Sequence, residues 1–71
     1  MKDLEIASSL KLARVARGWS QAELAERVDV TRQTIGLIEA GRYNPSIKLC
    51  LALARAIGQT LDDLFWIQGE R

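Results

Sequence analysis

Three consecutive polar residues, Arg32, Gln33 and Thr34, begin a segment with helical spacing, and Leu37 follows about one turn later. An arginine fork can pair with O6 and N7 of guanine, and a glutamine amide can pair with N6 and N7 of adenine. The methyl groups of threonine and leucine can contact the methyl group of thymine. These four side chains can therefore read base edges in a major groove, with the alternative that Arg32 holds only a phosphate.

Two helices must position these side chains, and the sequence between residues 21 and 40 predicts both. They are expected at Gln21–Val28 and Arg32–Ala40, joined by Asp29 and Val30, with Thr31 capping the second helix. A connection this short makes two helices cross steeply, as in a helix-turn-helix unit. The small side chain of Ala25 lets the second helix pack closely across the first, so a larger residue there should clash.

Capping residues and glycines predict five helices in one domain spanning residues 1–71. A serine or threonine stands at four helix starts: Ser20, Thr31, Ser46 and Thr60. Ser20 also forms a capping box with Glu23. Glycines that can close a helix in the left-handed conformation are Gly18, Gly41 and Gly58. The expected helices are about 9–17, 21–28, 32–40, 47–57 and 61–65. The predicted fold class is all-α, a compact five-helix bundle.

The two ends of the chain leave two questions open. Residues 4–6 alternate and residues 65–68 are β-prone, so a short ribbon pairing the termini is as compatible with the sequence as none. Phe65, Trp66 and Ile67 are three large apolar residues after the last helix, more than the small core needs. They either close the bundle or form a homodimer interface, where aromatic residues are enriched, and we favour the interface.

Composition excludes several classes of function. With no His and one Cys, the chain has no metal cluster and no disulfide. It also lacks an apolar run of about 18 residues, a secretory signal, a paired nucleophile and base, and a phosphate-binding glycine loop. We therefore expect a cytoplasmic protein that is not an enzyme and uses no cofactor.

Charge is distributed unevenly along the chain. The net charge is only +1, but residues 6–58 hold eight Lys/Arg against four Asp/Glu. This moderately basic middle suits a nucleic-acid partner. Lys11 and Arg17 are interpreted as a solvated helix face, and Cys50 as a core residue.

The stretch from Leu10 to Phe65, which includes GWSQAELAERVDVTRQTIGLIEAGRYNPS, resembles the Cro/phage-repressor (XRE) family of DNA-binding domains. The resemblance covers about four-fifths of the chain and follows the family in order and spacing. It implies a bundle of five helices whose second and third form the helix-turn-helix. Two positions depart from the family. Asp29 replaces the usual glycine of the turn, and Leu37 stands where a polar or basic side chain is common.

The resemblance also implies roles for individual residues. The base-reading positions are Arg32, Gln33, Thr34 and Leu37. The positions expected along the DNA backbone are Gln21, Thr31, Arg42, Tyr43 and Asn44. Gln21 also matches a position that often braces the recognition helix. Arg14 and Glu39 match an internal ion pair of some relatives.

Together these features predict a sequence-specific transcriptional regulator, in particular a repressor. It would bind double-stranded DNA at a palindromic operator as a homodimer, and lie at the nucleoid when bound. Two recognition helices about 34 Å apart would read a palindrome across one turn of the duplex. The alternative is an antitoxin or co-regulator whose main partner is another protein, although residues 1–8 and 66–71 are short for that role.

Overall fold

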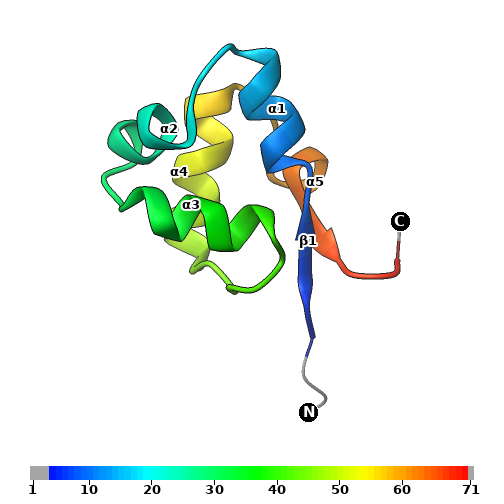
Figure 1. The fold of residues 1–71 in the computed structure, drawn as a ribbon. Helices are drawn as coiled ribbons and strands as arrows, with labels where there is room; N and C mark the ends of the chain where they lie inside the picture. The colour runs from blue at the N-terminus through cyan, green and yellow to red at the C-terminus, as the bar shows by residue number, and fades with distance from the viewer. Residues whose placement is uncertain (1–3, 71) are drawn as a thin grey trace.

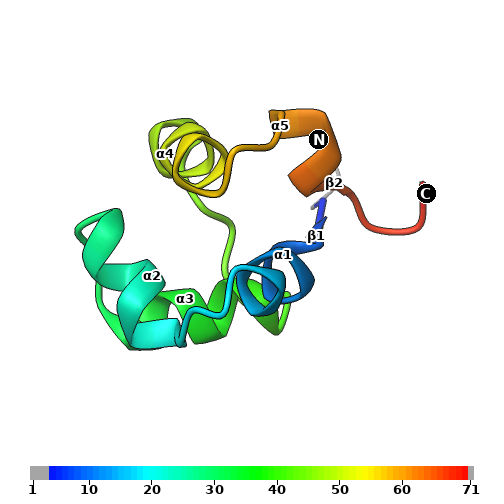
Figure 2. The same ribbon diagram turned by 90° about the horizontal axis from the view of Figure 1, so that it is seen from above.

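The computed structural model describes residues 4–70, which form five helices and a two-stranded ribbon (Figure 1). The elements in chain order are β1 (Ile6–Ser8), α1 (Leu10–Ala16), α2 (Gln21–Arg27), α3 (Arg32–Glu39), α4 (Ile47–Ile57), α5 (Leu61–Leu64) and β2 (Phe65–Ile67). Figure 2 shows α4 and α5 on one side of the molecule and α1, α2 and α3 on the other. The predicted bundle of five helices is confirmed, and all five begin and end within one residue of the expected positions.

Side-chain caps start four of the helices where the sequence predicts. The Ser20 hydroxyl accepts a hydrogen bond from the Glu23 amide, and the Glu23 carboxylate accepts one from the Ser20 amide, each at 3.0 Å. Thr31, Ser46 and Thr60 accept in the same way from the amide three residues ahead. Each cap satisfies an amide that has no partner inside its helix, which fixes where the helix begins.

Every helix contributes to one apolar core. The fully buried large side chains are Leu10, Leu24, Ile35, Leu53, Ile57 and Leu64. Burying a side chain of this size stabilises the fold by roughly 1.5–3 kcal/mol. Helices as short as these are marginal alone in water, so this shared core, together with the caps, holds α2 and α3 in place.

The ribbon that the sequence left open is present. β1 and β2 pair in antiparallel register, with Ile6 opposite Ile67 and Ser8 opposite Phe65. The Ser9 amide also donates to the carbonyl of Leu64 at 3.0 Å, at the junction of both strands with their helices. Phe65 is extended (φ −131°, ψ 143°), so α5 ends one residue earlier than expected and the chain enters β2 directly.

Arg17 corrects one expectation, because its guanidinium is not simply solvated. Its Nη2 donates to the carbonyl of Ile57 at the end of α4. Gly58 follows in the left-handed conformation (φ +82°), and a Cβ there would lie 2.7 Å from that Nη2. The guanidinium carbons of Arg17 and Arg27 lie 5.6 and 4.0 Å from the centre of the Trp19 ring. Arg17 therefore ties the end of α1 to the end of α4.

Candidate nucleic-acid interface

The turn between α2 and α3 is built from local backbone contacts. Asp29 adopts the left-handed conformation (φ +59°). Most residues with a side chain rarely adopt that conformation, but Asp and Asn tolerate it. The Val30 amide then donates to the carbonyl of Ala25 at 3.0 Å, and Ala25 is buried at the crossing of the two helices. The four residues 28–31 thus connect α2 to α3.

The recognition surface consists of the first turns of α3 and the loop that follows it, namely Arg32, Gln33, Thr34, Leu37 and residues 42–44. Arg32 and Gln33 are exposed at the start of α3, whereas Thr34 and Leu37 are half-buried. The Thr34 hydroxyl lies 3.0 Å from the Thr31 hydroxyl, and the Thr34 amide donates to the same Thr31 oxygen. In the free protein the hydroxyl groups of both threonines therefore form hydrogen bonds at the start of α3. Arg32 and Gln33 are the more accessible side chains.

A buried polar network lies beneath the recognition surface. Arg14 on α1 donates to both carboxylate oxygens of Glu39 on α3, at 2.7 and 3.2 Å, and to the carbonyl of Trp19 at 2.8 Å. The two charged side chains are only 10% and 5% exposed. The hydrogen bond to Glu39 raises the pKa of Arg14 above its usual value, although burial opposes this. The ion pair holds the end of α3 to the middle of the bundle.

Gln21 joins this network from α2. Its Nε2 donates to a carboxylate oxygen of Glu39 at 3.1 Å. The same side chain lies against Gly36 of α3, where a Cβ would sit 3.7 Å from Nε2. Gln21 is only half-buried, so its amide both braces α3 and remains partly accessible from outside.

The loop after α3 projects its side chains outward. Gly41 has φ +72°, and the Arg42 amide donates to the carbonyl of Leu37 at 2.9 Å, which ends the helix. Arg42, Tyr43 and Asn44 are exposed, with Tyr43 43% accessible. The residues predicted to contact the DNA backbone thus lie in the loop directly after α3, the helix that carries the residues predicted to read bases.

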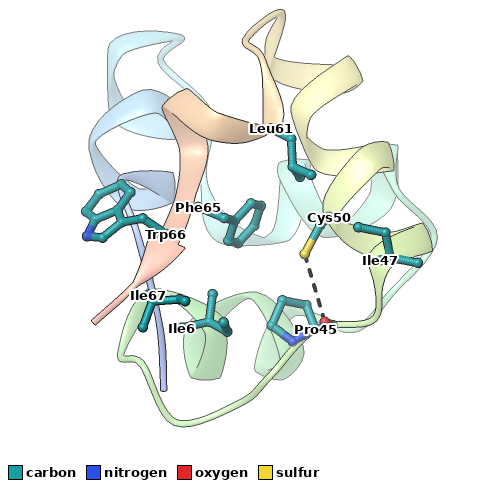
Figure 3. A pocket seen from close by; sticks show the side chains of 8 residues that line it. All are labelled: Ile6, Pro45, Ile47, Cys50, Leu61, Phe65, Trp66 and Ile67. Carbon is teal, nitrogen blue, oxygen red and sulfur yellow. Dashed lines mark hydrogen bonds between the residues drawn. The ribbon is translucent and has the colours of Figure 1, made fainter. Parts of the chain in front are cut away.

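The three predicted interface residues divide between two sides of the ribbon. Phe65, Trp66 and Ile67 are all half-buried in β2. Figure 3 shows the Trp66 ring pointing away from Phe65, whose ring faces Cys50 across a hollow. Successive side chains of a strand point to opposite faces, so Phe65 and Ile67 share one face and Trp66 lies on the other.

Sequence reasoning did not single out several residues of this hollow, above all Pro45, Ile47 and Leu61. One signal in the sequence could have pointed to this hollow: Ile47 is apolar and stands at the first position of its helix. In the structure its side chain is 65% exposed. Cys50 lies at its floor as a core residue, and burial raises the pKa of its thiol. Within residues 4–70 no cluster of His, Cys, Asp or Glu is placed to hold a metal ion. No helix of that range has the length and apolar character needed to cross a membrane.

Comparison with known proteins identifies the family. Residues 10–64 match the helix-turn-helix family model. The HTH-type transcriptional regulator YgzD of Bacillus subtilis is 41% identical over 63 residues, covering 89% of this chain and 96% of that protein. A regulator of the same type from Methanothermobacter thermautotrophicus is 55% identical over 49 residues, covering 68% of this chain and 71% of its own length.

Solved structures agree with this assignment. The restriction-modification controller protein C.AhdI of Aeromonas hydrophila superposes with a TM-score of 0.72 at 33% identity, covering 76% of this chain and 82% of that one. The clp gene regulator ClgR of Corynebacterium glutamicum gives a TM-score of 0.72 at 30% identity, and this chain matches 57% of its length. The fold and the relatives are those of DNA-binding regulators rather than enzymes. The chain belongs to the XRE-type helix-turn-helix family of transcriptional regulators.

Proposed function

We propose that this regulator is a repressor that binds a palindromic DNA operator as a homodimer, in the cytoplasm and at the nucleoid. The observation that carries the proposal is the exposed pair Arg32 and Gln33 at the start of α3, on a helix fixed from beneath by Glu39. A base-reading side chain must be accessible, and its helix must hold it at a defined position. The recognition surface meets both needs.

Backbone contacts would complete the binding. Arg42 and Asn44 are exposed next to α3, and the N-terminus of α3 presents amide groups that suit a phosphate. Gln21 can reach a phosphate while it braces α3, since it is half-buried and lies beside Gly36. Such contacts set the position of the protein on the duplex, while Gln33 and Arg32 supply the sequence preference.

Repression is supported by one relative in particular. The immunity repressor protein of Bacillus phage phi105 is 34% identical over 55 residues, which cover 78% of this chain and 38% of the phage protein. A small protein that occupies an operator can repress by blocking access to it. One recognition helix reads only a few base pairs, so a palindrome read by two copies gives the specificity that such a role needs.

The test is an in-vitro selection of the purified protein against a random duplex pool at about physiological salt, where non-specific phosphate contacts are weakened. We expect a palindrome with half-sites about one helical turn apart. The Gln33→Ala variant, selected in parallel, should recover a site that is degenerate at one position of each half. A pool without enrichment would contradict the proposal and favour the antitoxin or co-regulator role, in which another protein is the main partner.

A further inference from the structure

An apolar groove of about 320 Å³ lies between the ribbon and α4 (Figure 3). Its lining comes from the ribbon (Ile6, Phe65, Trp66 and Ile67), from the loop before α4 (Pro45), from α4 (Ile47 and Cys50) and from α5 (Leu61). None of its lining side chains is charged. The fully buried core of a protein interface is depleted in charge and enriched in aromatic residues, so the groove has the composition of such a core.

Two protruding aliphatic side chains stand beside the groove. Ile47, which also lines it, is 65% exposed, and Leu51 one turn along α4 is 53% exposed. A two-fold contact uses the same patch on both partners, so the patch must be complementary to itself. It therefore needs both a hollow and a protruding side chain that fits the hollow of the other copy. This face of α4 and the ribbon offers both.

We propose that the homodimer forms through this face, with Ile47 and Leu51 of each copy packed against the apolar groove of the other. The inference rests on the proposed function, because it names the surface that joins the two copies on the operator. A standard interface takes about 800 Å² from each partner. That is about a sixth of the 5067 Å² surface of this chain, so the groove and the exposed stripe of α4 would both be used.

The position of Pro45 supports this face over others. Pro45 lines the groove and directly follows the loop of residues 42–44 on the recognition surface. A contact here places the two loops near the two-fold axis. Both recognition surfaces can then meet one side of a single duplex, as a palindrome requires.

A second hollow, on the other side of the ribbon, is the rival surface. It is lined by Leu12 and Val15 of α1 and by Trp66, but also by Ser8, Ser9 and Lys11. Burying the charged ammonium group of Lys11 without a partner costs free energy, so this lining is less suited to the dry centre of a dimer. In the proposed interface Phe65 and Ile67 are therefore buried, and Trp66, which borders both hollows, lies at the edge.

The test compares two matched double variants of the full chain by analytical ultracentrifugation over a concentration series. Ile47→Glu with Leu51→Glu changes the α4 face, and Leu12→Glu with Val15→Glu changes the α1 face, where the two side chains are 75% and 56% exposed. All four positions are exposed on helices, and glutamate is a good helix former, so both variants should fold. Far-ultraviolet circular dichroism checks that they do.

We expect the wild-type protein and the α1 variant to sediment at twice the chain mass. The α4 variant should sediment as a monomer, with dimerisation weakened by at least about 100-fold, because charges would enter the buried centre of the contact. A dimeric α4 variant, or a monomeric wild type, would overturn the inference. A monomeric α1 variant beside a dimeric α4 variant would assign the contact to the α1 side.

DNA binding by the wild-type protein separates this inference from the proposed function. If the wild type binds its selected palindrome and the α4 variant remains a dimer, the interface assignment is wrong and the operator function stands. If the wild type is dimeric through α4 but selects no DNA sequence, the interface stands and the operator function is wrong.

Discussion

The recognition surface and the apolar groove lie on the same small bundle but are held in place by different kinds of contact. Beneath the recognition surface, Arg14, Gln21 and Glu39 form directional hydrogen bonds and a buried ion pair that join three helices. Around the groove, apolar packing of the ribbon against the core holds the elements together. Two aliphatic side chains of α4 remain exposed there. Directional contacts suit a surface that must read hydrogen-bonding groups, whereas an apolar surface suits association with a complementary shape.

The largest expected effect tests the polar half of this comparison. Glu39→Met should lower the free energy of unfolding by roughly 3–5 kcal/mol, because it leaves the buried Arg14 charge without its partner. At about 0.05–0.15 kcal/mol per residue, this would be a large part of the total stability of a 71-residue chain. Urea denaturation followed by circular dichroism measures it.

Two controls belong to that measurement. Arg14→Met combined with Glu39→Met removes both charges and should recover most of the loss. Ile47→Ala on the apolar side should change stability by no more than about 0.5 kcal/mol in dilute solution, because the side chain is exposed. A loss below about 1 kcal/mol for Glu39→Met would show that the ion pair does not hold α3.

The next effect concerns sequence preference. Gln33→Ala should cost about 1–3 kcal/mol of binding free energy at one base-pair position, and leave stability unchanged because Gln33 is exposed. Titration of the selected operator and its single base-pair variants measures the change. Equal losses on every duplex would mean that Gln33 is not a base reader.

Arg42→Ala should act more evenly. Losing one phosphate contact should weaken binding to all sequences alike and reduce the slope of log K against log salt by about one. Fluorescence anisotropy at several salt concentrations measures both quantities. Arg42→Lys serves as the control, since it keeps the charge and should restore most of the slope. A change confined to one base pair would contradict a backbone role.

The smallest effect is a pH dependence at the start of α2. Hydrogen bonds from the Ser20 amide and hydroxyl lower the pKa of Glu23 below its usual value of 4.5. Since the folded pKa is the lower one, this contribution to stability is complete above the unfolded pKa and is lost as pH falls through the folded pKa. NMR titration should show that Ser20→Ala raises the Glu23 pKa part of the way, because the amide remains. An unchanged pKa would show that the hydroxyl has no part in it.

Local signals predicted most of the fold. The caps at Ser20, Thr31, Ser46 and Thr60 act within three residues, so each helix start could be read directly from the sequence. Asp29 likewise adopts the left-handed conformation that the turn demands. The sequence does not decide the ribbon, because its register joins Ile6 to Ile67 across the whole chain, and three residues carry too little periodicity to decide a pairing.

The candidate site was predicted less completely. The contact between Arg14 and Glu39 was expected only through the family resemblance, since nothing in spacing brings residues 25 apart together. The sequence predicts a solvated Arg17, because its acceptor, the carbonyl of Ile57, lies 40 residues away. The groove, too, is assembled by tertiary packing from three separate segments of the chain.

Pro45 connects the apolar groove to the recognition surface, so that events at one surface can affect the other. It lines the groove and adjoins the loop of residues 42–44, so a second copy seated in the groove would restrain the part of the chain that meets the DNA backbone. Under the proposed interface, dimerisation and operator binding are then linked equilibria, and each must strengthen the other by the same factor. Operator occupancy would rise as a sigmoidal function of protein concentration, so that a modest change in synthesis could switch the operator between empty and filled.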